Sequence, residues 1–466
     1  MMRLVLIVLE QGPDIRQFVQ SGLAADLAHD ARIVWALGHQ ASARQLPGTD
    51  EKIQLSDIAP ALPAPLRLIS RLAERACNAR QERQSGRSQW MNFLDTLRAQ
   101  KTSPLKQRLD AVVSCAPVYR GLMALEKIMY RLWPLSRNQL GALRPDTIVL
   151  SNHATPAACG LLWCAQRSGI RTVVMQNSWK DAYARAHIPV APDVFVVPLQ
   201  GAADLLRRAN PGLVSEIQVR DTLHTTQLAD PGSLMERDAF CALYGLDPAR
   251  PIICLSAAAP NAVHCEPEIV SKLVSHLDDG PQILIRLNPM EDAPERWQAL
   301  AQRPGVILQA PDWDYSPAEK WSAPRPEDGQ IWASTIAHCA FNMSVPSTVT
   351  RDFLLFGKPV VNICFDARLD GTDPESNLRY WNAPFYEAYR DHGLIWPSFS
   401  LEDLVQNVKE ALEAEVGTTG RPPHSTAAEN RAHAVRTLLA DGQICKDFPA
   451  IQVSDGLGAS KEKDMH

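Results

Sequence analysis

Residues 344–366 constrain the fold most, because three structural signals follow one another there. A polar turn of Ser, Pro and Thr follows an apolar run, and apolar residues at helical spacing then extend over 349–356. Gly357 ends that helix, and residues 360–365 predict a buried strand. A small-residue loop that opens a helix offers backbone N–H groups and the positive end of the helix dipole. The stretch therefore predicts either an anion site in an α/β domain or an ordinary strand–helix–strand crossover.

Short strands alternate with helices along most of the chain, which predicts an α/β fold with a mostly parallel sheet in each half. The expected strands are 4–9, 31–37, 147–150, 172–175 and 193–197 in the first half, and 252–255, 283–286, 306–309 and 360–365 in the second. At 466 residues the chain exceeds one usual core, so we expect two domains. We predict an N-terminal domain over 1–230, a C-terminal domain over 235–416, and a helix with a flexible tail over 417–466.

Composition indicates a globular cytoplasmic protein. Hydrophobic residues make up 45% of the chain and charged residues 21%. No apolar run approaches the roughly 20 residues that span a bilayer, and residues 1–9 resemble a buried strand more than a signal peptide. The ten cysteines are scattered without a C-x-x-C pair, which favours reduced thiols.

The net charge of −5 is unevenly distributed. Residues 61–145 contain 15 Lys and Arg against 5 Asp and Glu, with apolar and aromatic residues interleaved at helical spacing. We interpret this segment as a basic helical insertion in the N-terminal half. It could contact an anionic membrane surface at the inner face, or be a solvated insertion whose long side chains cover a core. Nucleic acid is not expected as a partner, because no binding motif accompanies the charge.

Polar residues follow several strands of the second half, at the edge where parallel sheets bind ligands. They are Ser256; Arg286 and Asn288; Asp312 and Trp313; and Ser344, Ser347 and Thr348. Hydroxyls, backbone N–H groups and an Arg suit a diphosphate, and an indole could stack on a nucleobase. Each residue also has a structural explanation: Ser256 and Ser347 could cap helices. Arg286 could pair with Asp312, and Trp313 could pack against Pro317.

These residues carry a family resemblance. Residues 344–361 read S-x-P-S-T-x-x-x-D-x-L-L-x-G-K-P-V-V, and with the two α/β halves the chain resembles a GT-B-fold glycosyltransferase. It is most similar to bacterial surface-polysaccharide transferases and CDP-glycerol glycerophosphotransferases. The resemblance covers roughly the last two thirds of the chain and implies two Rossmann-like domains that face each other across a cleft.

The resemblance also implies positions for the substrates. The polar loop and its helix, from Ser344 to Asp352, would hold the donor's phosphates, with the turn at residues 286–289 nearby. The segment V-V-M-Q-N-S-W-K at residues 173–180 is similar to a Q-x-W-H-G segment of the family, which implies that Gln176 and Asn177 lie at the acceptor edge of the cleft.

Two departures bear on the chemistry. Residues 176–180 contain no histidine, and Asn288 stands where the glycerophosphotransferases have a histidine before proline. If those histidines transfer protons in the family, these departures favour a sugar transferase over a polyol-phosphate transferase.

An inverting sugar transfer requires stabilisation of the leaving diphosphate and a base near the acceptor hydroxyl. The triplet Asp312-Trp313-Asp314 has the letters of a D-x-D metal-binding motif. It lies in the half expected to bind the nucleobase, however, so no metal ion is expected. The candidate bases are Asp14 and His153, which follow predicted strands of the first half; His153 could instead be a cap or core residue. Ser21 and Gly22, at the first helix, are expected to line the same cleft.

The sequence thus predicts an inverting, metal-independent glycosyltransferase. It would move a sugar from a nucleotide-activated donor to a cell-surface glycan or lipid-linked acceptor, with the donor as co-substrate and no cofactor. Three alternatives remain open: a polyol-phosphate transferase of the CDP-glycerol type, a nucleotide-sugar epimerase of the same architecture, and a non-catalytic glycan-binding relative.

Overall fold

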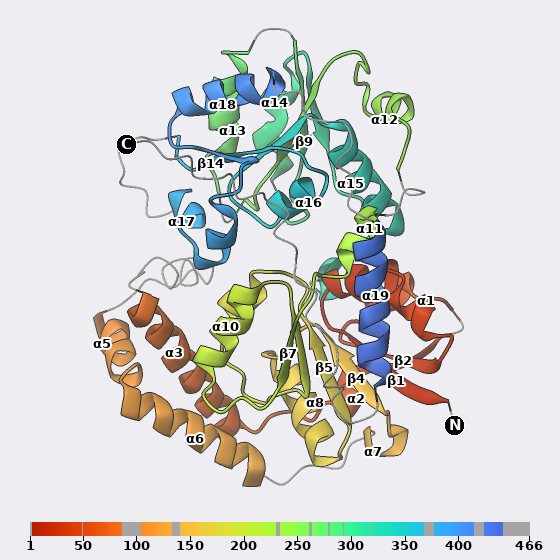
Figure 1. Ribbon diagram of the computed structural model, residues 1–466, viewed down its shortest axis with the longest axis vertical. Helices are drawn as coiled ribbons and strands as arrows, with labels where there is room; N and C mark the ends of the chain where they lie inside the picture. Colours follow the sequence, from red (N-terminus) through yellow and green to blue (C-terminus); the bar gives the residue numbers. More distant parts are fainter. Residues whose placement is uncertain are drawn as a thin grey trace, which may run out of the picture.

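Two parallel β-sheets organise the molecule (Figure 1). A computed structural model describes residues 2–48, 50–85, 104–132, 140–229, 234–260, 263–277, 280–291, 293–319, 321–367, 377–413 and 424–440. The first sheet has seven strands in the order β3-β2-β1-β4-β5-β6-β7, and the second has six in the order β10-β9-β8-β13-β14-β15. The expectation of an α/β fold with two Rossmann-like domains is therefore confirmed.

The first sheet is built from short apolar segments that are covered on both faces, as parallel sheets require. Its strands are β1 (Arg3–Leu9), β2 (Ala31–Leu37), β3 (Glu51–Gln54), β4 (Thr147–Leu150), β5 (Arg171–Met175), β6 (Val194–Val197) and β7 (Glu216–Val219). Its shorter helices are η1 (Ile15–Gln20, a π-helix), α1 (Leu23–Leu27), η2 (Gln40–Gln45), α2 (Leu55–Ile58), α7 (Leu140–Leu143), α8 (Pro156–Arg167), α9 (Asp181–Ala184), α10 (Gln200–Ala209) and α11 (His224–Ala229).

The second sheet contains β8 (Ile252–Ser256), β9 (Gln282–Arg286), β10 (Val306–Gln309), β13 (Phe341–Ser344), β14 (Val360–Ile363) and β15 (Ile395–Ser398). Its helices are α12 (Arg237–Tyr244), α13 (Glu266–Val274), η4 (Pro294–Trp297), α14 (Gln298–Ala301), η5 (Pro317–Glu319), α15 (Pro326–His338), α16 (Val349–Leu355), α17 (Leu378–Trp381), η6 (Pro384–Tyr389) and α18 (Leu401–Glu413). The strand–helix–strand unit predicted at residues 344–366 is present as β13, α16 and β14.

The insertion within residues 61–145 is helical where it is described. It comprises α3 (Ala64–Ser85), α5 (Pro104–Val113) and α6 (Ala116–Leu132), and α3 packs against both of the others. In Figure 1 these helices lie at the outer edge of the first domain. Residues 86–103 and 133–139, with several of the basic and aromatic residues noted above, lie outside the described residues.

Two segments from the second half of the chain pack against the first domain. The hairpin of β11 (Trp313–Ser316) and β12 (Trp321–Pro324) places Trp321 and Ala323 in the core of that domain. Gly12 lies against this hairpin, where a Cβ atom would come within 1.5 Å of the Ser322 carbonyl oxygen. Only glycine therefore allows this approach.

The last described helix, α19 (His424–Leu439), also returns to the first domain, beside α1 in Figure 1. Arg431 forms an ion pair with Asp26 in α1, and Thr147 Oγ1 in β4 donates a hydrogen bond to the Leu438 carbonyl oxygen at 2.9 Å. The sequence indicated a helix here but not its partner. Residues 417–423 and 441–466 lie outside the described residues.

The carboxyl ends of the two sheets come together. Trp179, in the loop after β5, packs with ring centroids 5.5 Å from Phe385 and 4.6 Å from Tyr389 of η6. Arg351 in α16 forms an ion pair with Asp221, which follows β7. These contacts place the loops after the strands of one sheet opposite those of the other.

Candidate functional site

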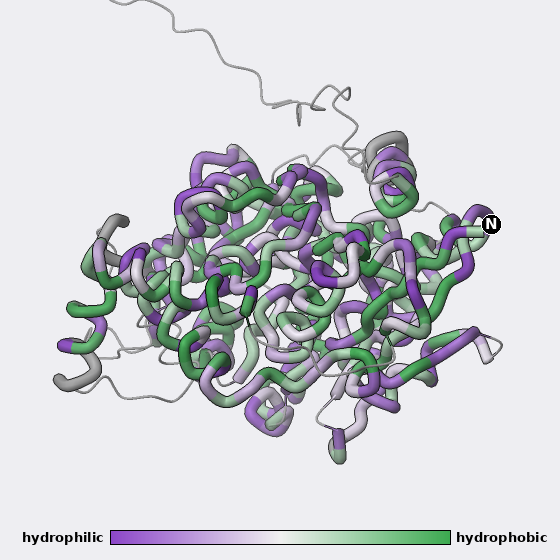
Figure 2. The backbone as a smooth tube through the Cα atoms, turned by 90° about the horizontal axis from the view of Figure 1, so that it is seen from below, coloured by the Kyte–Doolittle hydropathy of each residue, from purple (hydrophilic) through white to green (hydrophobic). Residues whose placement is uncertain are grey.

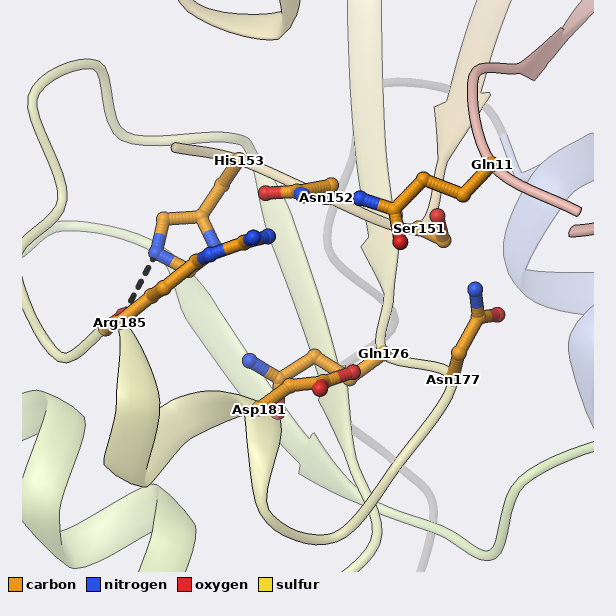
Figure 3. Close-up of a pocket in the computed structure, with 8 residues that line it drawn as sticks. All are labelled: Gln11, Ser151, Asn152, His153, Gln176, Asn177, Asp181 and Arg185. Carbon is orange, nitrogen blue, oxygen red and sulfur yellow. Dashed lines mark hydrogen bonds between the residues drawn. The ribbon is translucent and has the colours of Figure 1, made fainter. Parts of the chain in front are cut away.

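A small pocket lies at the carboxyl ends of β1, β4 and β5 (Figure 3). We call it the first-half pocket; it is lined by Gln11, Ser151, Asn152, His153, Gln176, Asn177, Asp181 and Arg185. These residues come from three loops because β1 and β4 are neighbours at the point where the strand order reverses. Of the predicted residues, His153, Gln176 and Asn177 line this pocket.

His153 is buried and held in one orientation. Its Nε2 lies 2.9 Å from the Arg185 carbonyl oxygen and 3.2 Å from the His187 carbonyl oxygen, so Nε2 carries the proton and donates to both. Burial and the Arg185 charge lower the pKa of His153 to about 4. The imidazole is therefore neutral at pH 7, and Nδ1 is an acceptor on the side of the ring that faces the pocket in Figure 3.

Asp14 ties together the three loops that form the pocket. Its Oδ2 accepts hydrogen bonds from the Glu10 and Gln11 backbone N–H groups at 2.8 and 2.7 Å. Its Oδ1 accepts from Ser151 Oγ and, at 2.7 Å, from Asn177 Nδ2. Burial raises the pKa of Asp14. Because both oxygens already accept two hydrogen bonds, this geometry favours a positioning part for Asp14 over the predicted role as base.

Three other pocket residues keep hydrogen-bonding capacity. Gln176 is buried, yet neither its Oε1 nor its Nε2 has a hydrogen-bond partner among the described residues, and Asn177 Oδ1 has none either. The Arg185 guanidinium donates no hydrogen bond within the described part of the chain, although it lies within electrostatic reach of Glu10 and Asp181. Burial raises the pKa of both carboxyl groups. This mixture of amides, carboxyls and one cation suits a ligand rich in hydroxyl groups.

The basic insertion contacts the pocket from behind. Glu126 in α6 lies with Oε2 2.9 Å from His187 Nε2, and both side chains are almost fully buried. The carbonyl group of the same His187 accepts the His153 Nε2–H. The insertion therefore supports the residue that orients His153.

The carboxyl ends of β8 and β13 form a second polar cluster. Ser256 Oγ donates to Asn342 Oδ1 at 2.7 Å, and Asn342 Nδ2 donates to Ser344 Oγ at 3.1 Å. All three residues are buried. The predicted residues Ser256 and Ser344 are thus connected to each other, and neither caps a helix.

Arg286, at the end of β9, forms a buried ion pair with Asp328 rather than the pair with Asp312 that we considered. Asp328 Oδ2 also accepts a hydrogen bond from Trp313 Nε1 at 3.1 Å. Arg286 and Trp313 therefore share one carboxylate at the amino end of α15. Asp312 instead pairs with Arg325.

Arg16 reaches this cluster from the first domain. Its guanidinium lies 5.8 Å from the centroid of the Trp313 ring, and the charges of Asp352, Asp328 and Arg286 act on it. Burial lowers the pKa of Arg16. Within the described ranges this guanidinium makes no hydrogen bond. We call Arg16 and Arg286 the cationic pair.

The remaining predicted donor residues lie around α16 and β9. Ser347 and Thr348 are half-buried immediately before α16, and their carbonyl oxygens accept the Thr350 and Arg351 N–H groups at 3.2 and 3.3 Å. Asp352 accepts hydrogen bonds from Trp332 Nε1 at 2.9 Å and lies 3.3 Å from His224 Nε2. Asn288 stabilises its own turn, since its Oδ1 accepts the Met290 N–H at 2.9 Å.

Ser21 and Gly22 do not line the first-half pocket. Ser21 is buried, its Oγ donates to the Gln17 carbonyl oxygen at 2.7 Å, and its own carbonyl oxygen accepts from Thr226 Oγ1. Gly22 has a φ of 84°, and a Cβ atom there would meet the Arg431 side chain of α19. The geometry therefore corrects the expected cleft position: these residues lie beneath α19.

Sequence reasoning missed Arg16, Arg185, Asp181 and Asp328. None has a local motif, because each acquires its neighbours from another loop or from the other domain. Residues 10–16 follow a buried strand, which is the one signal that could have indicated Arg16.

No family model matches the sequence, and no curated protein matches it. Solved structures are similar in fold. The S. aureus MnaA co-structure with UDP is 10% identical, with a TM-score of 0.52, and the match covers 96% of this chain and 100% of that chain. UDP-GlcNAc 2-epimerase from Neisseria meningitidis bound to UDP-GlcNAc is 11% identical, with a TM-score of 0.50 and 94% and 100% coverage. The Methanocaldococcus jannaschii UDP-GlcNAc 2-epimerase is 12% identical, with a TM-score of 0.50 and 94% and 99% coverage.

At these identities the similarity shows the fold alone, and it confirms the GT-B-like arrangement of two Rossmann-like domains. Within the described ranges, no group of three or more His, Cys, Asp or Glu side chains is placed to hold a metal ion. Nor does any helix in those ranges have both the length and the apolar character to cross a bilayer.

Proposed function

We propose that this protein is a nucleotide-sugar-dependent glycosyltransferase, inverting and independent of metal ions, that transfers its sugar to a glycan or lipid-linked acceptor. The observation that supports this most is that Arg16 of the first domain joins Arg286 and Trp313 of the second, with its guanidinium 5.8 Å from the centroid of the Trp313 ring. Arg16 lies in η1, which follows the loop that contains the pocket residue Gln11, and it is within electrostatic reach of Arg286. A diphosphate at the cationic pair would place the attached sugar next to a pocket suited to hydroxyl groups.

The donor would bind the second domain. Its diphosphate would accept hydrogen bonds from Arg16, Arg286 and the hydroxyls of Ser347 and Thr348, which precede α16. As the bond between the sugar and the diphosphate breaks, negative charge grows on the leaving oxygen, and these fixed donors would stabilise it. Trp313 would border the nucleotide.

The acceptor would occupy the first-half pocket. Its attacking hydroxyl would donate to His153 Nδ1, which takes the proton as the new glycosidic bond forms. The imidazolium would keep its Nε2–H hydrogen bonds to the Arg185 and His187 carbonyl oxygens, while Asp14 holds the three loops together through its four hydrogen bonds. A displacement of this kind, with base and leaving group on opposite sides of the sugar, inverts its configuration.

A nucleotide-sugar 2-epimerase is the second candidate, because structures of UDP-GlcNAc 2-epimerases share this fold over nearly their whole length. Such an enzyme would use the carboxyls and His153 to move a proton on the sugar itself, without an acceptor. The exposed basic insertion favours the transferase, since a small substrate has no need of such a surface.

One incubation series separates the candidates. Purified protein is mixed with UDP-, GDP-, CDP- and CMP-sugars and with CDP-glycerol, with and without membrane extract as acceptor, and products are identified by mass spectrometry and NMR. The proposal expects release of the free nucleotide that depends on acceptor. An epimerised sugar without acceptor would establish the second candidate, and glycerol phosphate transfer would establish the polyol-phosphate transferase. Binding without turnover would indicate a non-catalytic relative.

A further inference from the structure

Helix α6 has two chemically distinct faces. Tyr119, Met123, Glu126 and Tyr130 recur every three or four residues and are buried against the first domain. The opposite face carries apolar side chains that remain exposed: Val118 at 38%, Leu125 at 47%, Ile128 at 51% and Leu132 at 74%. We call this exposed side, with its basic neighbours Arg120, Lys127 and Arg131, the outer face of α6.

The outer face contains no carboxylate. The only acidic residue of α6 is Glu126, which points inward to His187. The side chains of Arg120 and Arg131 have no partner within the described ranges, and Lys127 reaches only the Pro211 carbonyl oxygen at 3.4 Å. Three cations thus lie along one flank of the apolar stripe, without compensating charge among the described residues.

The neighbouring helix continues this character. Leu109 and Val112 of α5 are also exposed, and the only carboxylate of α5, Asp110, receives a hydrogen bond from Arg75 of α3 at 2.8 Å. Figure 2 shows hydrophobic and hydrophilic residues interleaved along the backbone when the molecule is seen from below. A single exposed leucine is ordinary, but four exposed apolar residues along one side of a helix, with cations along one flank, mark an interaction surface.

We propose that the outer face of α6 docks on a bilayer that contains anionic lipids. The helix is about 25 Å long at 1.5 Å per residue, which suits a helix lying in the interface. Its apolar stripe would enter the acyl boundary, while Arg120, Lys127 and Arg131 meet the lipid phosphates. A lipid-linked acceptor follows only if the proposed transferase function also holds.

A second copy of the chain fits this surface less well. In a two-fold dimer the same patch meets itself, so the cations of one outer face would lie against those of its partner. An anionic lipid surface complements both the apolar stripe and the charge.

Docking of this face would also bring the membrane close to the residues that support the first-half pocket. The inward side of the same helix carries Glu126, which pairs with His187, and the carbonyl group of His187 holds His153. A lipid surface on one side of α6 is therefore separated from the first-half pocket by this helix and by the Glu126–His187 contact.

The test is co-sedimentation of full-length protein with vesicles of phosphatidylcholine plus phosphatidylglycerol, compared with phosphatidylcholine alone, at about 0.05 and about 0.5 M salt. Wild-type protein should bind the anionic vesicles at low salt and lose most of that binding at high salt. Leu125→Glu/Ile128→Glu and Arg120→Glu/Arg131→Glu should each weaken binding at least about tenfold. The matched control Val214→Glu/Arg208→Glu changes an exposed valine and an exposed arginine outside the insertion, and it should bind like wild type.

Wild-type protein that ignores anionic vesicles at low salt would overturn the inference, and so would outer-face variants that bind as well as the control. A dimer in solution that dissociates when Leu125 and Ile128 are changed would assign the face to a second copy instead. Circular dichroism melting checks that the variants are folded. Nucleotide binding by the same preparations separates the two proposals. Protein that binds a nucleotide but no vesicles contradicts membrane docking alone, and protein that binds vesicles but no nucleotide contradicts the proposed function alone.

Discussion

The two halves of the site differ in how fully their polar groups are already paired. At the second domain, Arg286 is paired with Asp328, and Ser256, Asn342 and Ser344 form a closed chain of hydrogen bonds. At the first-half pocket, the Gln176 side chain has no hydrogen-bond partner and the Arg185 guanidinium donates no hydrogen bond, within the described part of the chain. A paired cluster stabilises the fold and presents a fixed shape, whereas an unpaired buried amide is costly unless a ligand satisfies it. The most conspicuous sequence motif, at residues 344–366, therefore does not mark the region with the most unpaired polar groups, which is the first-half pocket.

The largest effect is expected from His153. His153→Ala should lower kcat by about 10² to 10⁴, because it removes the proton acceptor from the pocket. Nucleotide affinity should stay within about twofold, since the cationic pair is untouched. Steady-state kinetics on the sugar donor that supports turnover, with nucleotide titrations in parallel, measure both quantities. His276→Ala, which changes an exposed histidine far from the pocket, is the control. Equal activity of the two variants would remove His153 from the mechanism.

The pH dependence of stability tests the state of the same residue. His153 has a folded pKa of about 4, below its value of 6.5 in an unfolded chain, so the unfolded state binds more protons between these two values. Its contribution is fully present above pH 6.5 and is lost as the pH falls toward 4, by up to about 3 kcal/mol. Urea unfolding between pH 4 and 7 should show a smaller slope against pH for His153→Gln than for wild type. Identical slopes would mean that His153 is not held neutral.

The cationic pair extends this comparison, because Arg286 forms a buried ion pair with Asp328 whereas Arg16 makes no hydrogen bond among the described residues. Arg16→Ala should weaken nucleoside diphosphate binding by about 1.5–3 kcal/mol with little loss of stability, since no buried carboxylate depends on Arg16 for a hydrogen bond. Arg286→Ala should weaken binding and also destabilise the fold by about 3–5 kcal/mol, because it leaves Asp328 buried and without its cation. Isothermal titration and thermal melts give the two readouts, with the exposed Arg207→Ala as control. Two variants that behave alike in both readouts would contradict the asymmetry.

The smallest effect contrasts two buried amides. Gln176→Leu should raise stability by about 1 kcal/mol while impairing catalysis, because it removes an amide that has no partner in the fold. Asn342→Leu should lower stability by about 1–3 kcal/mol, because Ser256 and Ser344 lose their shared partner. Chemical unfolding of both variants measures these changes. Destabilisation by Gln176→Leu equal to that by Asn342→Leu would show that the pocket is no more open than the second cluster.

Much of the fold was predictable, because most strands of the two parallel sheets are short continuous apolar runs such as residues 4–9 and 252–255. The strands that were missed, β3, β7 and β15, lie at sheet edges and carry polar or Pro residues, as in Glu51–Gln54 and Glu216–Val219. The hairpin β11–β12 and the packing of α19 depend on contacts with the first domain. No local sequence pattern predicts such contacts.

The site was predictable only in part. His153, Gln176 and Asn177 follow strands and so could be placed at the sheet edge. Arg185 and Arg16 could not, because the position of a long side chain is decided by the loops and the other domain around it. Ser21 and Gly22 were misplaced for the same reason: α19 covers them from the far end of the chain.

Nucleotide binding by the wild-type protein and Arg16→Ala tests the central claim most directly. A panel of UDP, GDP, CDP and CMP is added to each protein, and the melting temperature is followed as a function of concentration, since a ligand that binds only the native state raises it. The account predicts that at least one of these nucleotides raises the melting temperature of the wild type, and that Arg16→Ala loses most of that increase while unfolding at an unchanged temperature without ligand. A wild-type protein that none of the nucleotides stabilises, or one whose stabilisation survives Arg16→Ala in full, would contradict the placement of a nucleotide-sugar donor between these domains.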